Sequence, residues 1–165
     1  MTQSILPAAI AGLAEQVVAT NRAAGRTVAL AESCTGGLVS AALTDIAGSS
    51  AILDRSYVTY SNQSKVDMLG VSETILDTFG AVSIACAWAM AQGALQRSGA
   101  DVAVAISGIA GPDGGSDQKP VGLVVFARVE RGVEEYLAEE RLFDGSSRAA
   151  VRTQATLVAL ELLLP

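Results

Sequence analysis

Two short runs of apolar residues limit the possible folds of this chain more than any other feature. Residues 27–31 (Thr-Val-Ala-Leu-Ala) follow a turn signal, and residues 101–107 (Asp-Val-Ala-Val-Ala-Ile-Ser) precede a loop rich in glycine. Strands that are covered on both faces show this continuous apolar character, whereas half-exposed strands alternate polar and apolar residues. We therefore expect two buried strands in a sheet that has helices on both sides.

Patterns typical of helices and of further strands fill the rest of the sequence. Apolar residues recur at helical spacing in residues 5–24, 38–46 and 149–164. Candidate N-caps of three more helices are Ser61, Ser72 and Ser83. Additional strands are expected over residues 52–60, 121–130 and 133–142, the last two as a hairpin. The order of these elements predicts an α/β fold: a three-layer α/β/α sandwich with a mixed sheet.

The length and charge of the chain limit its organisation and its partners. Its 165 residues contain no linker or repeat, so we expect a single domain over residues 1–165. Charged residues make up only 17% of the chain, against about 25% in typical soluble domains, which favours a homo-oligomer. The net charge of −6 opposes nucleic-acid binding. Neither a membrane-spanning run nor a signal peptide is present, so we expect a cytoplasmic location.

The chain contains no histidine, which narrows its possible chemistry. Ser-His and Cys-His pairs and histidine-ligated metals are excluded. A catalytic base must then be a lysine, an acidic residue, a tyrosine or a bound water. The chain has only two lysines, Lys65 and Lys119, and its two cysteines match no metal-binding spacing. We expect neither a metal nor a cofactor.

The segment Ala-Glu-Ser-Cys-Thr-Gly-Gly at residues 31–37 joins the first buried strand to a helix. A hydroxyl at Ser33 would lie near the unpaired amides of that helix, which can hold an oxyanion or a phosphate. The alternative is that Ser33 or Thr35 only caps the helix. Cys34 is a rival nucleophile, but without a histidine to activate it we interpret it as a packed residue.

A second polar segment, residues 57–65, follows the next expected strand. Lys65 lies four residues after Ser61, so the pair does not have the Ser-x-x-Lys spacing of penicillin-binding proteins. Lys65 can instead meet Ser33 across the fold. The alternative is an ordinary solvated lysine on a helix.

A third segment, residues 107–120, is rich in Gly, Pro and Asp and follows the second buried strand, where open α/β sheets bind ligands. It matches neither the dinucleotide-binding nor the phosphate-loop motif, although its backbone can form an anion nest. A merely flexible loop has the same composition. Arg148 and Arg152, four residues apart, form either a phosphate clamp or a solvated face.

Seven motifs in one order resemble the CinA C-terminal domain family. They are AESCTGG at 31–37, VTYSNQSK at 58–65, LGV at 69–71, AVS at 81–83, SGIAGPDGG at 107–115, KPVG at 119–122 and RxxVRxQAT at 148–156. The resemblance covers roughly residues 13 to 163. It implies metal-independent hydrolysis of the carboxamide of nicotinamide mononucleotide, which gives nicotinic acid mononucleotide and ammonia.

The resemblance also implies roles for individual residues. Ser33 would be the nucleophile and Lys65 its general base, with Tyr60 and Thr35 nearby. Amides around residues 35–37 would hold the oxyanion. Glu32 would either balance the positive charge of the pyridinium ring or be a structural carboxylate. The expected substrate-binding residues are Glu32, Gly36, Gly37, Asn62, Gly108, Gly111, Gly114, Gly115 and Arg148.

Two motifs depart from the family pattern. The acidic residue expected after AVS is replaced in Ile84-Ala85-Cys86, and residues 143–148 differ from the usual Phe-x-Gly-Asp-Arg. Two alternatives to the amidase therefore stay open. The first is a nucleotide-binding protein without catalysis, and the second is a partner-binding module, because proteins named CinA are associated with DNA competence and damage.

Overall fold

The computed structural model describes residues 4–165. Its α-helices are α1 (Ala8–Ala24), α2 (Leu38–Thr44), α3 (Asn62–Leu69), α4 (Glu73–Phe79), α5 (Ile84–Gln96) and α6 (Arg148–Leu162). Its strands are β1 (Val28–Glu32), β2 (Leu53–Val58), β3 (Val102–Gly108), β4 (Leu123–Glu130) and β5 (Leu137–Leu142). The side chains of Ser61, Ser72 and Ser83 cap α3, α4 and α5, as the sequence predicts.

Most expected boundaries lie within two residues of those observed, and two are wrong by three residues or more, each for a local reason. The first helix begins at Ala8 rather than at residue 5, because Pro7 has an extended backbone with ψ of 142°. The last strand begins at Leu137 rather than at residue 133. Its pairing with β4 starts where Leu137 meets Arg128, so residues 133–136 form part of the connection between the two strands.

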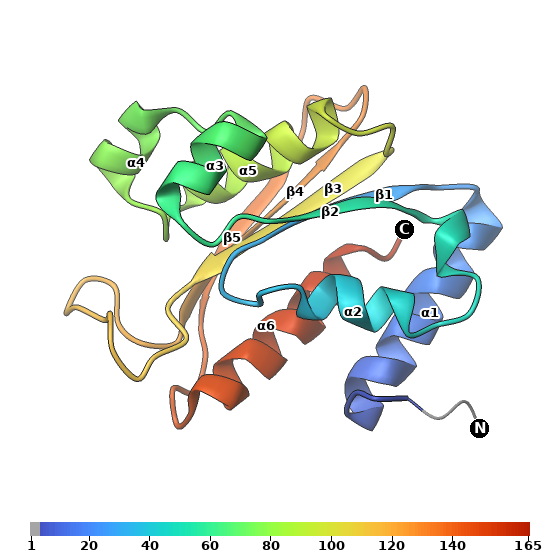
Figure 1. The fold of residues 1–165 in the computed structure, drawn as a ribbon, viewed down its shortest axis with the longest axis horizontal. Coiled ribbons are helices and arrows are strands. Elements are labelled where there is room, and N and C mark those ends of the chain that lie inside the picture. Colours follow the sequence, from blue (N-terminus) through green and yellow to red (C-terminus); the bar gives the residue numbers. More distant parts are fainter. Residues whose placement is uncertain (1–3) are drawn as a thin grey trace.

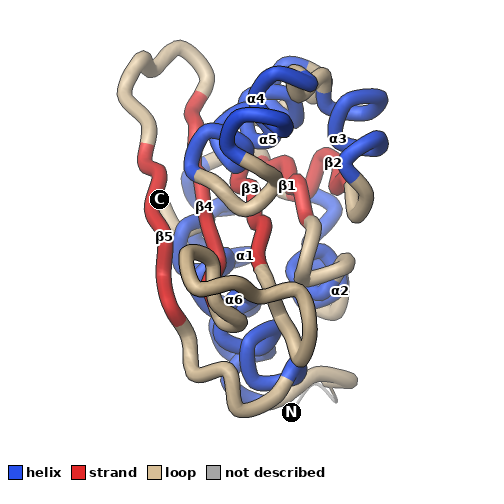
Figure 2. The backbone as a smooth tube through the Cα atoms, turned by 90° about the vertical axis from the view of Figure 1, so that its left-hand side faces the viewer, coloured by secondary structure: helices blue, strands red, loops and turns tan. Residues whose placement is uncertain are grey.

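The sheet has the strand order β2-β1-β3-β4-β5. Strands β2, β1 and β3 are parallel, while β4 and β5 extend the sheet in antiparallel fashion. Helices α3, α4 and α5 cover one face and α1, α2 and α6 the other (Figure 1). Figure 2 shows the strands in the same order from β5 to β2. The predicted three-layer α/β/α sandwich with a mixed sheet is confirmed.

The two faces of the sheet carry side chains of different size. Large residues of β1, β3 and β4, such as Leu30, Ile106 and Phe126, point toward α1, α2 and α6. Alanines dominate the face under α5, where Ala31, Ala105 and their neighbours lie. Because alanines project little, α5 packs close to the sheet, and alternating side chains explain why both strands read as continuously apolar.

The parallel strands bring three connections to one edge of the sheet. The carboxyl ends of β2, β1 and β3 lie side by side, since Glu32 pairs with both Val58 and Ile106. Residues 33–37, 59–61 and 109–122 therefore leave the sheet at the same place. Open α/β sheets bind ligands at this edge. Among residues 4–165, no helix is both long enough and apolar enough to span a membrane.

Candidate active site

Ser33 is the first residue after β1, and its backbone fixes its position. Its N–H donates to the carbonyl of Ile106 on β3 at 2.9 Å, so the residue continues the sheet before the chain turns. Gly36 and Gly37 complete the turn with φ of 58° and 97°, values that favour glycine. The side chain of Ser33 lies at the floor of a cavity and is 8% exposed.

Lys65 reaches this hydroxyl from α3, on the other side of the sheet. Its side chain is 1% exposed, and its Nζ lies 3.1 Å from Ser33 Oγ. The carbonyl oxygen of Thr59 lies 2.8 Å from the same nitrogen and that of Tyr60 lies 3.5 Å away. The structure thus brings together the two residues that the sequence places 32 positions apart.

The surroundings of Lys65 favour its neutral form and orient it. Burial lowers the pKa of the Lys65 amine from its ordinary value, and the two cysteine thiols oppose this shift only in part. Backbone carbonyls can only accept hydrogen bonds, so those of Thr59 and Tyr60 take the N–H groups of a neutral amine. Its lone pair is then left to face Ser33 Oγ. In its protonated form the amine donates to Ser33 Oγ across 3.1 Å, and in its neutral form the same contact lets the amine accept a hydrogen bond from the serine hydroxyl.

Cys34 lines the same cavity, but its surroundings make its thiol a poor nucleophile. Burial raises the pKa of its thiol to about 11, so the thiolate needed for nucleophilic attack is scarce near neutral pH. Its burial among apolar neighbours agrees with the interpretation as a packed residue.

Glu32 has a different place from the one expected. Its carboxylate is fully buried and accepts hydrogen bonds from the hydroxyl of Thr35 at 2.7 Å and from the amides of Gly37, Val39 and Ser40. These are the first amides of α2 and its N-cap. The expectation that Glu32 faces a pyridinium ring is therefore corrected: the side chain holds the start of α2 and does not line the cavity.

The same hydrogen bonds revise the expected oxyanion donors. The amide of Gly37 donates to Glu32, and that of Gly36 donates to the carbonyl of Ser33 at 3.0 Å, so neither is available to a ligand. Within residues 4–165, the N–H group of Thr35 has no acceptor, and that of Cys34 interacts only with its own thiol. The donors that these bonds leave for a ligand are therefore the amides of residues 34 and 35, of which only Thr35 belongs to the expected range 35–37.

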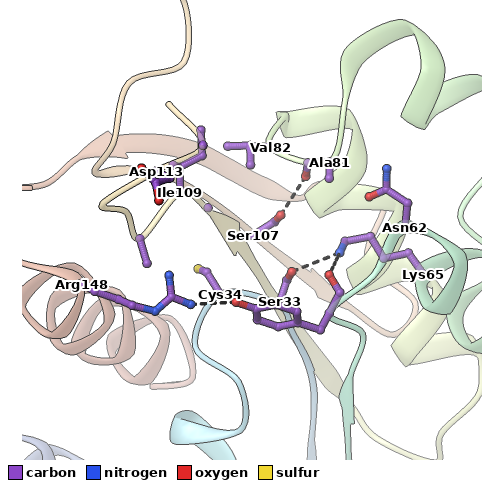
Figure 3. Close-up of a pocket in the computed structure, with 14 residues that line it drawn as sticks. Ser33, Cys34, Asn62, Lys65, Ala81, Val82, Ser107, Ile109, Asp113 and Arg148 are labelled. Atoms are coloured by element: carbon purple, nitrogen blue, oxygen red, sulfur yellow. Dashed lines mark hydrogen bonds between the residues drawn. The ribbon is translucent and has the colours of Figure 1, made fainter. Parts of the chain in front are cut away.

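The cavity has a volume of about 270 Å³ and is built from all three connections at this edge, together with α3 and α6 (Figure 3). Its lining residues are Ser33, Cys34, Tyr60, Asn62, Lys65, Ala81, Val82, Ser107, Gly108, Ile109, Ala110, Asp113, Gly114 and Arg148. Of the expected substrate contacts, Asn62, Gly108, Gly114 and Arg148 lie here. Those that do not are Glu32, Gly36, Gly37, Gly111 and Gly115.

Arg148, the first residue of α6, crosses from one wall of the cavity to the other. Its guanidinium donates to the hydroxyl of Tyr60 at 2.7 Å and to the carbonyl of Gly111 at 2.7 Å. One turn later, Arg152 donates to the carbonyls of Cys34 and Thr35, each at 3.1 Å. The face of α6 that carries both arginines is partly solvated, because Arg148 is exposed and Arg152 half-buried, but both guanidinium groups are held by hydrogen bonds. It supports the turn after β1 and the loop after β3.

Sequence reasoning did not select two polar lining residues, Ser107 and Asp113. Ser107 donates its hydroxyl to the carbonyl of Ala81 at 2.8 Å and is almost fully buried. A polar residue at the end of an apolar strand next to the strand of Ser33 was an available signal for Ser107. No cluster of three or more Cys, Asp or Glu side chains suited to a metal ion occurs in residues 4–165.

Comparison with known proteins agrees with this geometry. A family model described as the CinA C-terminal domain matches residues 10–165. The chain belongs to the CinA C-terminal domain family. The resemblance seen in the seven motifs is thereby confirmed, and this family accounts for nearly the whole of the chain.

Two relatives named nicotinamide-nucleotide amidohydrolase are similar to this chain over nearly their full lengths. Nicotinamide-nucleotide amidohydrolase PncC of Escherichia coli K12 is 54% identical over 152 residues, which are 92% of this chain and 90% of that protein. The protein of the same name from Enterobacter agglomerans is 51% identical and is covered to 92%. The crystal structure of competence/damage inducible protein CihA from Agrobacterium tumefaciens superimposes with a TM-score of 0.94, at 49% identity, over 98% of this chain and 97% of that one.

Proposed function

We propose that this chain hydrolyses the carboxamide of nicotinamide mononucleotide to nicotinic acid mononucleotide and ammonia. The observation that carries the proposal is the buried amine of Lys65 at 3.1 Å from the hydroxyl of Ser33, at the floor of a cavity. Similarity over nearly full length to two nicotinamide-nucleotide amidohydrolases names the substrate. A serine activated by a lysine is suited to cleaving an amide without histidine.

The first half of the reaction forms an acyl-enzyme. Neutral Lys65 takes the hydroxyl proton of Ser33 as Oγ bonds to the carboxamide carbon, and the carbonyl oxygen becomes an oxyanion. The amide of Thr35, which has no acceptor within residues 4–165, and that of Cys34, which interacts only with its own thiol, are the candidate donors for that oxyanion. Such a donor contributes about 3–4 kcal/mol of transition-state stabilisation in known cases. The C–N bond then breaks as the ammonium of Lys65 gives its proton to the leaving nitrogen, which departs as ammonia.

The second half reverses these proton movements. Lys65, neutral again, takes a proton from a water molecule as the water oxygen bonds to the acyl carbon. The bond from that carbon to Ser33 Oγ breaks, and the proton on Lys65 returns to Oγ. The products are the free enzyme and the carboxylic acid of the nucleotide, so every proton is accounted for.

Other residues would bind or position the substrate. The guanidinium of Arg148 suits the phosphate, because an arginine at a cavity wall can bind it through two N–H groups. Tyr60 positions Arg148 through its hydroxyl, and Thr35 positions Glu32 through its own. Asn62, Gly108 and Gly114 line the cavity and remain candidate contacts.

The decisive assay is ammonia release from nicotinamide mononucleotide by the purified protein. We expect Ser33→Ala and Lys65→Met to lower kcat by about a thousandfold or more, as removal of a catalytic nucleophile or its base does. Lys119→Met is the matched control, because the chain has only one other lysine and it contacts Phe79 instead. Full activity in either Ser33→Ala or Lys65→Met, with the fold intact by circular dichroism, would rule out the pair.

An acyl adduct on Ser33 separates this mechanism from direct attack by water. Intact-mass measurement after rapid acid quench should detect the wild-type protein with an added acyl group and should not detect it in Ser33→Ala. Turnover without such an adduct, even at short times, contradicts the covalent route. Absence of ammonia release by the wild type would favour the two non-catalytic alternatives. Of these, the DNA-associated module has no support from any feature of residues 4–165. Cytoplasmic location and homo-oligomerisation stay predictions.

A further inference from the structure

The cavity carries few charges, and their arrangement is uneven. Its charged lining residues are Lys65, Asp113 and Arg148. Asp113 belongs to the loop between β3 and β4. In Figure 3 it lies on the opposite side of the cavity from Lys65, next to Ile109. A ligand whose reacting group meets Ser33 would therefore extend toward the wall that holds Asp113.

Asp113 is the carboxylate that is free to meet a ligand. Within residues 4–165 it makes no hydrogen bond, and no lysine or arginine nitrogen lies within 4.0 Å of it. Arg148 already donates to Tyr60 and to Gly111. The carboxylate of Glu32 is buried and satisfied by four donors. Asp113 is thus the one acidic residue that lines the cavity, and within residues 4–165 its carboxylate has no hydrogen-bond or ion-pair partner.

We propose that Asp113 recognises the positive charge of the N-alkylated pyridinium ring, and so selects cationic pyridine nucleotides over neutral ones. This rests on the proposed function. The ring bears a fixed charge two bonds beyond the carbon that carries the carboxamide, so with the carboxamide at Ser33 the charge lies inside the cavity. An opposite charge on the wall favours this ring electrostatically, and it contributes nothing to a neutral ring of the same shape.

The test compares oxidised nicotinamide mononucleotide with its reduced 1,4-dihydro form, whose ring is neutral. Equilibrium dissociation constants are measured by calorimetry at low salt on the Ser33→Ala background, so that neither ligand is consumed. Asp113 is exposed, so we expect Asp113→Asn to weaken binding of the oxidised form by about threefold to fivefold, the upper part of the range for an exposed charge pair. Binding of the reduced form should change less than twofold. Raised salt should shrink the effect.

Asp117→Asn is the matched control. It removes the same charge from the same loop but does not line the cavity, so it should change neither dissociation constant by more than twofold. Equal weakening of both ligands by Asp113→Asn would overturn the proposal, as would no change. Tighter binding of both forms would place Asp113 beside the phosphate instead. Because binding is measured without turnover, absence of ammonia release by the wild type would refute the proposed function while this comparison still decides the role of Asp113.

Discussion

At the scale of single residues, the amine of Lys65 is shaped by what surrounds it. A lysine in water is protonated at neutral pH and has no lone pair to offer, with a pKa of about 10.4. Burial in this fold works against the charge, and two backbone carbonyls turn the lone pair toward Ser33. The proposed base of this chain, which has no histidine, is thus an amine whose pKa burial lowers.

The pH dependence of the rate follows from the lowered pKa of Lys65. We expect kcat/KM to rise with pH along a one-proton limb centred below about 10.4, because the neutral fraction of the amine grows as pH passes its lowered pKa. Activity is lost as pH falls below that value. Initial rates between about pH 5 and 10 measure this rising limb of kcat/KM. The chain has no histidine, so titration of a histidine cannot be its cause. A rate that stays flat down to the pH of unfolding contradicts this assignment.

Glu32 gives a second prediction at this scale, on stability. Glu32→Gln should lower the free energy of unfolding by about 2–3 kcal/mol, because an amide nitrogen would then face buried N–H donors of α2. Urea unfolding measures the change, and Glu134→Gln, at an exposed position, should have almost none. If Glu32→Gln instead raises KM and leaves the unfolding curve unchanged, Glu32 contacts substrate after all.

At the scale of elements, the contact between α5 and α3 holds the base in place. Gly93 of α5 lies against the end of α3, where an added Cβ would come within 2.1 Å of the carbonyl oxygen of Leu69. Leu69 is one turn beyond Lys65 on the same helix. The absence of a side chain at residue 93 therefore sets how closely α3, and with it the amine, approaches the sheet.

Gly93→Ala should disturb both stability and activity. The new methyl group must push α3 away, which we expect to cost about 3 kcal/mol of unfolding free energy and to lower kcat, because Lys65 moves with the helix. Gly12→Ala is the matched control in α1, where a Cβ meets nothing within 4 Å. Gly12→Ala should raise the free energy of unfolding by about 0.5–1 kcal/mol. Equal unfolding curves for the two variants would show that α3 and α5 do not pack as described.

The elements differ in how well the sequence predicts them. The apolar runs of β1 and β3 and the serine caps are local signals, so the helices and strands they predict were found. The use of Glu32 was not predictable, because Asp or Glu at a strand end can face either a ligand or the amides of the next helix. That choice depends on how α2 turns, and the sequence pattern contains no information on this. Arg152 was ambiguous for the same reason, since its partners lie 117 and 118 residues away.

At the scale of the whole molecule, the described chain should unfold as one unit. The single tryptophan, Trp88, lies in α5, whereas far-ultraviolet circular dichroism reports helices on both faces of the sheet. If residues 1–165 form one domain, the urea transitions seen by Trp88 fluorescence and by circular dichroism should have the same midpoint and slope. Two separated midpoints would show that the layers unfold independently.

Ser33 and Lys65 belong to different layers of the sandwich. Ser33 starts the connection to α2 on one face, and Lys65 is carried by α3 on the other. The 3.1 Å contact between Ser33 Oγ and Lys65 Nζ therefore joins residues that lead to opposite faces of the sheet. Because Ser33 is tied to the sheet and Lys65 lies in α3, any sliding of α3 over the sheet changes this contact directly. Turnover would then respond to hydrostatic pressure, crowding or stiffening substitutions in regions remote from the cavity, and would fall well before the ordered structure melts.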